Sequence, residues 1–410
     1  MTVHLKPLDE QVIVITGASS GIGLATARMA ARQGARVALG ARDRDALATI
    51  AEEIRAQGGE AVHSVVDVAD EAEMRQLARA ALNAFGRIDT WVNNAGISIY
   101  GRISEVPLED QRRLFETNYW GMVIGSRIAV EHLRADGGAL INVGSVVSDR
   151  SMMLQGPYSA SKFAVKGFTD ALRMEVEADG LPISITLVKP GVIATPFEEH
   201  ARNYMDAEPA NPPPAYAPEL VAKAILNAAR HPHRELTVGG GGKLFSLSQR
   251  LAPRATDWMM ERFLPGILRS GGPVRHHDDS LYGPSGHHGH ERGGQHAYVR
   301  ETSLYTTAAK HPLATAAVFA GIGALGALAW QMSQGRTSRR LLTYMPSGGR
   351  SEASEPPTDW ARRHAFDTGT AHAGVYDPGT GTAVETTVET TAETRVPLDE
   401  HSLETQRQPS

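Results

Sequence analysis

Short apolar runs alternate with longer amphipathic stretches between Gln11 and Val238. The apolar runs predict seven strands: Gln11–Thr16, Ala35–Gly40, Ala61–Val66, Asp89–Asn93, Ala139–Gly144, Ile183–Lys189 and Glu235–Val238. The stretches between them carry apolar residues at helical spacing and predict helices: Ile22–Gln33, Arg44–Gln57, Glu71–Phe85, Pro107–Leu133, Tyr158–Ala178 and Pro218–Ala229. Repeated strand–helix units with nearly continuous apolar strands are typical of a parallel sheet covered on both faces. We therefore expect an α/β fold with a doubly wound, seven-stranded parallel sheet, which binds ligands at the carboxyl ends of its strands.

The pattern changes after four consecutive glycines, Gly239–Gly242. Apolar residues at helical spacing continue to Leu268, so residues 241–270 are expected to form helices that pack on a catalytic domain at 9–240. Residues 271–305 are rich in Gly, His and charge, which predicts a flexible linker. Residues 306–335 contain a hydrophobic helix, and residues 336–410, which have few large apolar side chains, are expected to be disordered.

Leu313–Met332 is an uncharged window long enough to span a bilayer as a helix. It is rich in Ala and Gly, and its stronger positive flank (Arg336, Arg339 and Arg340) follows it. The positive-inside tendency would keep that flank in the cytoplasm, where the catalytic domain must also be, so a simple single span is in conflict. A helix in protein contacts or at the membrane interface avoids this conflict, and membrane association stays open.

Composition narrows the classes of function. The 410-residue chain has a net charge of −5, which gives no reason to expect nucleic acid as a partner. It has no cysteine, which excludes disulfides, thiolate zinc sites and a cysteine nucleophile. The histidines between residues 276 and 296 lie in Gly-rich sequence without a supporting frame, so no metal site is expected. Residues 1–9 carry no apolar signal-peptide core, and we expect a cytoplasmic protein.

A glycine-rich loop, Thr16–Gly23, joins the first strand to the first helix. Its glycines permit a tight turn and let backbone N–H groups approach a phosphate at the helix N-terminus, although the spacing departs from the Gly-x-Gly-x-x-Gly pattern. The second strand is followed by Arg42, whose guanidinium suits a ribose 2′-phosphate; the alternative is a surface residue in a turn. Asp67 could accept a hydrogen bond from an adenine amino group or cap the next helix.

Tyr158 and Lys162 are one helical turn apart, and Ser145 precedes them at the end of the fifth strand. A cation near a phenol favours the phenolate, so the pair is suited to proton transfer. On its own such a pair is more often a solvated helix face. Likewise, Ser145 alone could cap a loop, and Asn118 alone could be a helix-kink residue.

Taken in order, Thr16-Gly-xxx-Gly-x-Gly23, Asn93-Asn94-Ala95-Gly96, Asn118, Ser145, Tyr158-xxx-Lys162 and Pro190-Gly191 resemble the short-chain dehydrogenase/reductase family. The resemblance covers about residues 9–240 and implies a Rossmann fold. It implies that Ser145 hydrogen-bonds the substrate oxygen, that Tyr158 exchanges its proton, and that Lys162 binds the nicotinamide ribose and lowers the Tyr158 pKa. Asn118 then holds a water that links Lys162 to solvent. The cofactor residues that follow are Gly17, Ser19, Ser20, Gly21, Ile22, Gly23, Arg42, Asp67, Val68, Asn94, Ala95, Gly96, Tyr158, Lys162, Pro190, Gly191, Ile193 and Thr195.

The expected function is hydride transfer between NADP(H), with NAD(H) as the alternative, and an alcohol or carbonyl substrate. Gly191–Pro218 is the expected lid, and Ile97–Tyr100, Val147 and Met152–Gln155 the other walls, which together suggest an apolar substrate. The resemblance also implies a homo-dimer or homo-tetramer formed through the helices Pro107–Leu133 and Tyr158–Ala178. The alternatives are a non-catalytic dinucleotide-binding module and a membrane-associated scaffold.

Overall fold

The computed structural model describes residues 3–241, 248, 251–269, 272–274, 278–285, 289–294, 298–303 and 306. The chain divides into two units, Met1–Gly335 and Arg336–Ser410, and every described residue belongs to the first. The predicted membrane segment Leu313–Met332 and the predicted disordered tail at 336–410 lie outside the described residues. Within the described part of the chain, no helix is both long and apolar enough to cross a bilayer.

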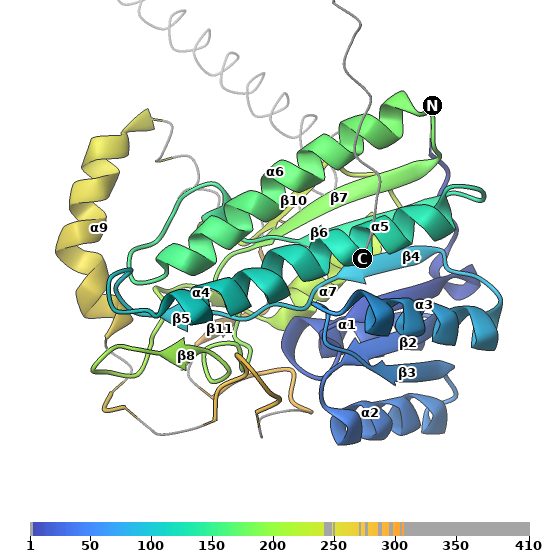
Figure 1. Cartoon of the computed structure of the whole chain (residues 1–410), viewed down its shortest axis with the longest axis horizontal. Coiled ribbons are helices and arrows are strands. Elements are labelled where there is room, and N and C mark those ends of the chain that lie inside the picture. Colours follow the sequence, from blue (N-terminus) through green and yellow to red (C-terminus); the bar gives the residue numbers. More distant parts are fainter. Residues whose placement is uncertain are drawn as a thin grey trace, which may run out of the picture. The chain divides into compact units, whose positions relative to one another are not determined.

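A seven-stranded parallel sheet forms the centre of the first unit and confirms the predicted fold class (Figure 1). Each of the seven predicted runs forms one strand, and the chain changes direction along the sheet between β1 and β4. At such a reversal the loops that follow the two strands diverge and leave a crevice at the carboxyl edge of the sheet. From one edge to the other, the strands are β10 (Glu235–Val238), β7 (Ile183–Pro190), β6 (Gly138–Val143), β4 (Thr90–Asn93), β1 (Val12–Thr16), β2 (Arg36–Ala41) and β3 (Ala61–Val65).

Both faces of the sheet are buried, which explains why its strands read as continuous apolar runs. Along β1, Ile13 and Ile15 join one hydrophobic core, and Val12 and Val14 join the other. The first core also takes side chains of α1 (Gly21–Arg32), α2 (Arg44–Ala56) and α7 (Pro218–Ala228). The second takes side chains of α3 (Glu71–Phe85), α5 (Gly121–Leu133) and α6 (Gly156–Ala178).

The long helix predicted over Pro107–Leu133 is interrupted. It consists of α4 (Leu108–Phe115), a π-helical turn, η2 (Glu116–Trp120), and α5. Such turns insert an extra residue into a helix and often occur at functional sites. Here the turn contains Asn118, whose buried side-chain amide bonds both backbone groups of Ile97: Oδ1 accepts from its N–H (2.8 Å) and Nδ2 donates to its carbonyl (2.9 Å).

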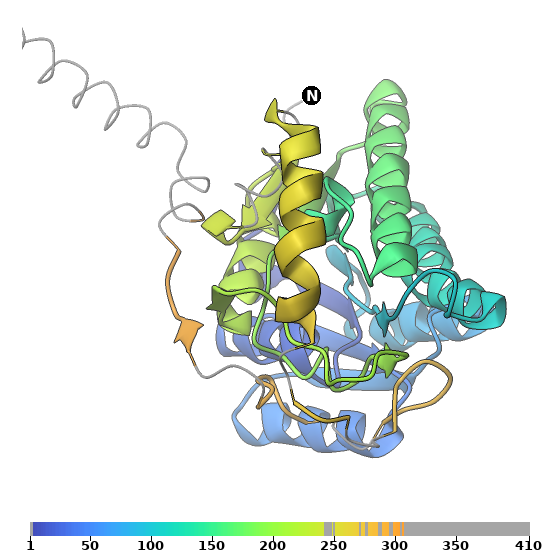
Figure 2. The same cartoon turned by 90° about the vertical axis from the view of Figure 1, so that its left-hand side faces the viewer.

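Segments outside the central sheet close the carboxyl side of the molecule. Helix α9 (Pro253–Leu268), the yellow helix of Figure 2, contributes Met260, Leu264 and Leu268 to the hydrophobic cluster that contains Tyr158. Two short parallel pairs lie nearby, β5 (Ile99–Tyr100) with β8 (Arg202–Asn203), and β9 (Ala215–Tyr216) with β11 (Val299–Arg300). Short 3₁₀ helices, η1 (Leu8–Glu10) and η3 (Val146–Ser148), complete the described elements used below.

Parts of residues 271–305, predicted to be a flexible linker, make specific contacts with the catalytic domain. Strand β11 pairs with β9, and Leu281, only 1% exposed, packs in the same cluster as Tyr158. These contacts are made with residues far away in the sequence, so the local Gly- and His-rich composition carries no sign of them.

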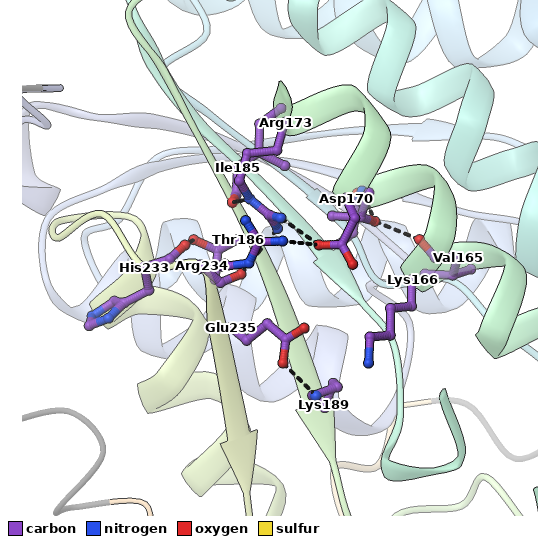
Figure 3. Close-up of polar contacts among 12 residues, drawn as sticks. Val165, Lys166, Asp170, Arg173, Ile185, Thr186, Lys189, His233, Arg234 and Glu235 are labelled. Carbon is purple, nitrogen blue, oxygen red and sulfur yellow. Dashed lines mark hydrogen bonds and ion pairs between the residues drawn. The ribbon is translucent and has the colours of Figure 1, made fainter. Parts of the chain in front are cut away.

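Buried cations join α6, β7 and β10 at one edge of the sheet (Figure 3). Arg173 of α6 donates from Nε to the carbonyl of Ile185 (3.0 Å), from Nη2 to that of Arg234 (3.1 Å) and from Nη1 to Asp170 (2.6 Å). Its side chain is 6% exposed, so these partners replace water for every donor that it turns inward.

Lys189 of β7, also buried, pairs with Glu235 at 2.6 Å and with Asp149 at 2.9 Å. Burial alone would raise the pKa of Asp149, but its contacts with Lys166 and Lys189 outweigh burial and lower that pKa to about 2. The edge is therefore held by paired charges as well as by apolar packing.

We expect Arg173→Ala to lower the free energy of unfolding by about 2–4 kcal/mol, because it removes a buried guanidinium together with its hydrogen bonds to two backbone carbonyls and to Asp170. Arg75→Ala is the control: Arg75 pairs with Glu71 and Glu131 on the surface and should cost less than about 1 kcal/mol. Urea unfolding measures both. Equal losses would contradict the role given to the buried guanidinium.

Candidate active site

The floor of the site lies where β1 and β4 end side by side. The Thr16 hydroxyl donates to the carbonyl of Val92 (3.3 Å) and accepts from the N–H groups of Asn94 (3.0 Å) and Ala95 (3.2 Å). The side-chain amide of Asn94 donates in return to the carbonyls of Thr16 (3.0 Å) and Gly17 (3.2 Å). These bonds hold the two loops together at the point where the strand order reverses.

Glycines allow the loop after β1 to lie against its surroundings without a gap. Gly17 has φ +65°, and a Cβ there would lie 2.8 Å from the Cα of Ala95. A Cβ at Gly23 would lie 2.0 Å from the carbonyl oxygen of Gly17. Any side chain at either position would push the loop away from α1 and from the β4 loop. The loop thus lies along the cavity at the N-terminus of α1, the end of a helix at which phosphate binds.

Tyr158, Lys162 and Ser145 meet above this floor. Tyr158 and Lys162 are buried on one face of α6, with Lys162 Nζ 5.8 Å from the centre of the Tyr158 ring. Lys162 Nζ donates to the carbonyl of Val143 at the end of β6 (3.0 Å). Ser145, two residues further along, lines the same cavity and lies close enough to the Tyr158 hydroxyl to act on its pKa.

Burial dominates the electrostatics of this pair. It raises the pKa of Tyr158 to about 12, a value that the hydrogen bond with Ser145 lowers and the charge of Glu198 raises. It lowers the pKa of Lys162 to about 8. The pKa of Tyr158 is therefore raised where the sequence predicted a lowering by Lys162, because desolvation of the phenolate is the largest influence on this group.

Ser145 and Asn118 have structural roles as well. Ser145 Oγ accepts from the N–H of Val147 (3.3 Å) and so caps η3. The side-chain amide of Asn118 bonds Ile97 and also Ser161 Oγ (3.0 Å). The loop-cap interpretation of Ser145 and the helix-irregularity interpretation of Asn118 thus coexist with their positions beside Tyr158 and Lys162.

One cavity collects the residues singled out from the sequence. Every residue predicted to bind the cofactor lines it except Gly23, which packs behind the loop. Ser145 lines it too, whereas Asn118 lies behind the wall, against Ile97 and Gly96. Among the described residues, no group of His, Asp and Glu side chains is arranged to hold a metal ion.

Arg42 and Asp67 lie at the far end of this cavity from Tyr158. Arg42 is partly buried, and its Nη2 donates to the carbonyl of Ser280. Its Nη1 is buried without a hydrogen-bond partner among the described residues, so a cation faces the cavity with a donor to spare. Such a donor fits an anionic group such as a phosphate.

Asp67 does not cap the next helix, as one interpretation had it. The N-cap of α3 is Asp70, whose side chain accepts from the N–H of Glu73 at 3.0 Å. Asp67 lines the cavity, accepts from the N–H of Ala69 (3.1 Å) and forms an ion pair with Arg113. The Asp67 carboxylate is thus already paired with Arg113 and the N–H of Ala69.

The walls near Tyr158 are less apolar than predicted. Apolar and aromatic side chains are present as expected, and Phe197 of the predicted lid lies against the Tyr158 ring, 5.7 Å between ring centres. Polar side chains from the predicted lid and wall also line the cavity, namely Gln155, Glu198, His200 and Asn211. Glu198 is 2% exposed and accepts from the Asn211 amide, so a carboxylate is buried near the catalytic end of the cavity.

Two lining residues come from the segment that was expected to be a linker. Ser280 and Pro284 complete the wall beside Arg42. Neither follows a strand or belongs to a motif, and no pattern in the sequence pointed to them.

Comparison with known proteins agrees with this geometry. The family model described as short chain dehydrogenase matches residues 11–206. The "Uncharacterized oxidoreductase YxnA" of Bacillus subtilis (strain 168) is 44% identical over 328 residues, which cover 79% of this chain and 92% of that protein. This alignment is longer than the region 9–240, so it reaches into the C-terminal extension.

Two further relatives match mainly the catalytic region. The 11-beta-hydroxysteroid dehydrogenase A of Arachis hypogaea is 34% identical over 260 residues, 60% of this chain and 74% of that protein. A crystal structure of an alcohol dehydrogenase from the archaeon Thermococcus sibiricus, complexed with 5-hydroxy-NADP, superimposes with a TM-score of 0.50 and 28% identity over 56% of this chain and 95% of that one.

One conclusion follows from the parallel sheet and from the glycine-lined crevice where the strand order reverses. The matching sequences and the matching solved structure lead to the same conclusion. The chain belongs to the short-chain dehydrogenase/reductase family of oxidoreductases, which use a nicotinamide dinucleotide.

Proposed function

We propose that this protein is an NADP(H)-dependent oxidoreductase that interconverts an alcohol and a ketone or aldehyde through Ser145, Tyr158, Lys162 and Asn118. The observation that carries the proposal is that Ser145, Tyr158 and Lys162 line the same cavity as the glycine loop. The names of two relatives, a hydroxysteroid dehydrogenase and an alcohol dehydrogenase, support an alcohol or carbonyl substrate.

The bound nicotinamide supplies or accepts the hydride. During reduction the substrate oxygen gains negative charge, and the hydroxyls of Ser145 and Tyr158 are placed to donate hydrogen bonds to it. Tyr158 then gives its proton to that oxygen, and in the reverse direction it accepts the proton back. Lys162, held at the carbonyl of Val143, is the cation available to stabilise the resulting phenolate. Asn118 holds the loop beneath Lys162 by its bonds to Ile97, and the predicted water path through Asn118 is part of this proposal.

Arg42 is the basis for proposing NADP(H) over NAD(H). Its guanidinium follows β2, where a carboxylate would select for a ribose 2′-hydroxyl, and its buried Nη1 is suited to a phosphate oxygen. The solved relative with an NADP derivative is consistent with this choice.

We also propose a substrate that is largely apolar but carries a polar group, because Gln155 and Glu198 are buried in otherwise apolar walls. Homo-oligomerisation through α4, α5 and α6 belongs to the proposal as well. It is supported by large apolar side chains that are exposed on or beside these helices, including Trp120, Phe163 and Met174. The cytoplasm remains the expected location.

We expect Tyr158→Phe to lower turnover at least about 10³-fold, because it removes both a hydrogen-bond donor and the proton donor. The ring keeps its contact with Phe197, so NADPH binding should be retained. Tyr119→Phe, a partly buried tyrosine of η2 that stacks on Phe168, is the control and should keep its activity. Steady-state kinetics on a panel of ketones and alcohols, with fluorescence titration of NADPH, measures both properties. Full activity of Tyr158→Phe would refute the mechanism.

We expect Arg42→Ala to weaken use of NADPH relative to NADH by about 10- to 100-fold in kcat/KM, since charge-assisted bonds to the 2′-phosphate are lost. Arg44→Ala, an exposed arginine two residues away, should affect the two cofactors equally. Kinetics with each cofactor at saturating substrate gives the ratio. A wild-type enzyme that prefers NADH would contradict this assignment.

We expect Lys162→Met to abolish turnover yet stabilise the cofactor-free fold at neutral pH. Burial lowers the pKa of Lys162 to about 8 from 10.5, so the folded state binds this proton more weakly than the unfolded chain. The resulting penalty, on the order of 3 kcal/mol, is complete below pH 8 and disappears as pH rises towards 10.5.

Urea unfolding between pH 6 and 10.5 tests this expectation. The stability advantage of Lys162→Met over the wild type should be largest below pH 8 and shrink above it. Lys223→Met, which alters an exposed lysine of α7, should show no such step. A pH-independent difference for Lys162→Met would show that burial of the ammonium is not the cause.

A further inference from the structure

Part of the C-terminal extension lies across the end of the cavity where Arg42 is found. We call residues 279–285 and 289–292 the clasp. Ser280 and Pro284 of the clasp line the cavity together with Arg42 and Asp67, so the clasp forms part of the cavity wall. The clasp therefore encloses this end of the cavity without filling it.

Backbone hydrogen bonds join the clasp to the phosphate loop. The N–H of Gly289 donates to the carbonyl of Ser19 (2.9 Å), and the carbonyl of His290 accepts from the N–H of Gly21 (2.9 Å). An ion pair between Arg28 of α1 and Glu291 (2.9 Å) lies next to them. The clasp thus extends the loop that carries the family's phosphate-binding glycines.

A second set of contacts joins the clasp to two cations, Arg42 and Arg113. The carbonyl of Ser280 accepts from Arg42, and the carbonyl of Leu281 accepts from Arg113 Nε (3.0 Å). Arg113 in turn pairs with Asp67. Arg42, suited to the adenosine 2′-phosphate half of the cofactor, therefore contacts the clasp directly. Asp67 is connected to the clasp through Arg113.

One buried carboxylate, Asp110 of α4, fastens the clasp to the body. It is 2% exposed and accepts from the hydroxyl of Tyr282 at 2.7 Å. It also accepts from the hydroxyl of Tyr204 and pairs with Arg202 at 3.0 Å. Its partners thus come from both the clasp and the predicted lid.

Arg202 connects the same two segments directly. Its Nε pairs with Asp279 of the clasp at 2.8 Å, and its guanidinium lies over the Tyr282 ring, 5.3 Å from the ring centre. The N–H of Ser280 donates to the carbonyl of His200, again in the lid (2.8 Å). Phe197 of the same lid lies against the Tyr158 ring, so the lid reaches from the substrate end of the cavity to the clasp.

We propose that the clasp closes the adenosine 2′-phosphate end of the cofactor site, and that Asp110 is a positioning residue which makes the clasp and the substrate lid open and close together. This inference rests on the proposed NADP(H) function. A dinucleotide bound as the family binds it lies beneath the clasp and leaves only after Tyr282 and Asp279 release their partners. Cofactor exchange is then coupled to opening of the substrate lid.

Release of NADPH from the full-length protein tests the clasp. In stopped flow, the enzyme–NADPH complex is mixed with excess NADP⁺ and the fluorescence of bound NADPH is followed. Tyr282→Phe removes one charge-assisted bond from a side chain that is 54% exposed, so folding is not at risk. We expect release to become about tenfold faster, and adenosine 2′,5′-bisphosphate to bind about tenfold more weakly.

Variants at both ends of the connection through Asp110, Tyr282 in the clasp and Tyr204 in the lid, test the coupling of clasp and lid. If the lid and the clasp move together, Tyr282→Phe raises KM for the carbonyl substrate, and Tyr204→Phe in the lid speeds NADPH release. Asp110→Asn should do both. The rate of hydride transfer in a single turnover should change by less than about twofold in Tyr282→Phe, because the variant leaves Tyr158 and Ser145 in place.

The matched control is Tyr298→Phe, a tyrosine of the same extension that is 74% exposed and expected to change neither rate. Unchanged NADPH release in Tyr282→Phe and Asp110→Asn would overturn the clasp. Faster release without any change in KM, and no effect of Tyr204→Phe, would overturn the coupling through Asp110. A wild-type protein that binds neither NADPH nor NADH would instead refute the proposed function, and the clasp with it.

Discussion

The pairing of the β1 and β4 loops through Thr16 and Asn94 is the interaction on which the site depends. Parallel strands with a change of chain direction leave a crevice, but the crevice has a defined shape only if the two loops that border it are fixed to each other. The Thr16 hydroxyl and the Asn94 amide do this with bonds to backbone groups on both sides. Because those bonds bring the loops so close, Gly17 must lack a side chain, and the phosphate loop takes its form from that constraint.

The sequence predicted the parts of the fold that are set by burial and by short-range geometry. Strands such as β1 are buried on both faces, so their apolar runs are unambiguous, and the spacing of Tyr158 and Lys162 follows directly from the pitch of α6. It offered a helix kink at Asn118 only as an alternative and did not predict its π-helical form, because that turn depends on bonds to Ile97 in another element. For the same reason it missed Ser280 and Asp110, whose partners are separated from them by long stretches of chain.

Burial has opposite consequences for the two groups of the catalytic pair. It makes the phenol of Tyr158 harder to ionise and the ammonium of Lys162 easier to deprotonate, so in the protein alone both groups are pushed towards their neutral forms. Proximity in the sequence predicted the pairing but not this shift, since the shift depends on the apolar residues that surround α6, η3 and α9. The fold therefore keeps a cation in a place where it costs stability, as is common for groups that carry out chemistry.

The contacts between the clasp and the phosphate end of the cavity are made largely by its main chain. The carbonyls of Ser280, Leu281 and His290 are available whatever side chains these positions carry, whereas the N–H of Gly289 belongs to a residue with φ +85°, which favours glycine. Substitutions at Ser280, Leu281 and His290 would then leave these backbone bonds in place, whereas Asp279 and Tyr282 hold the clasp through their side chains. A Gly- and His-rich segment can in this way form part of a cofactor site although its composition is that of a linker.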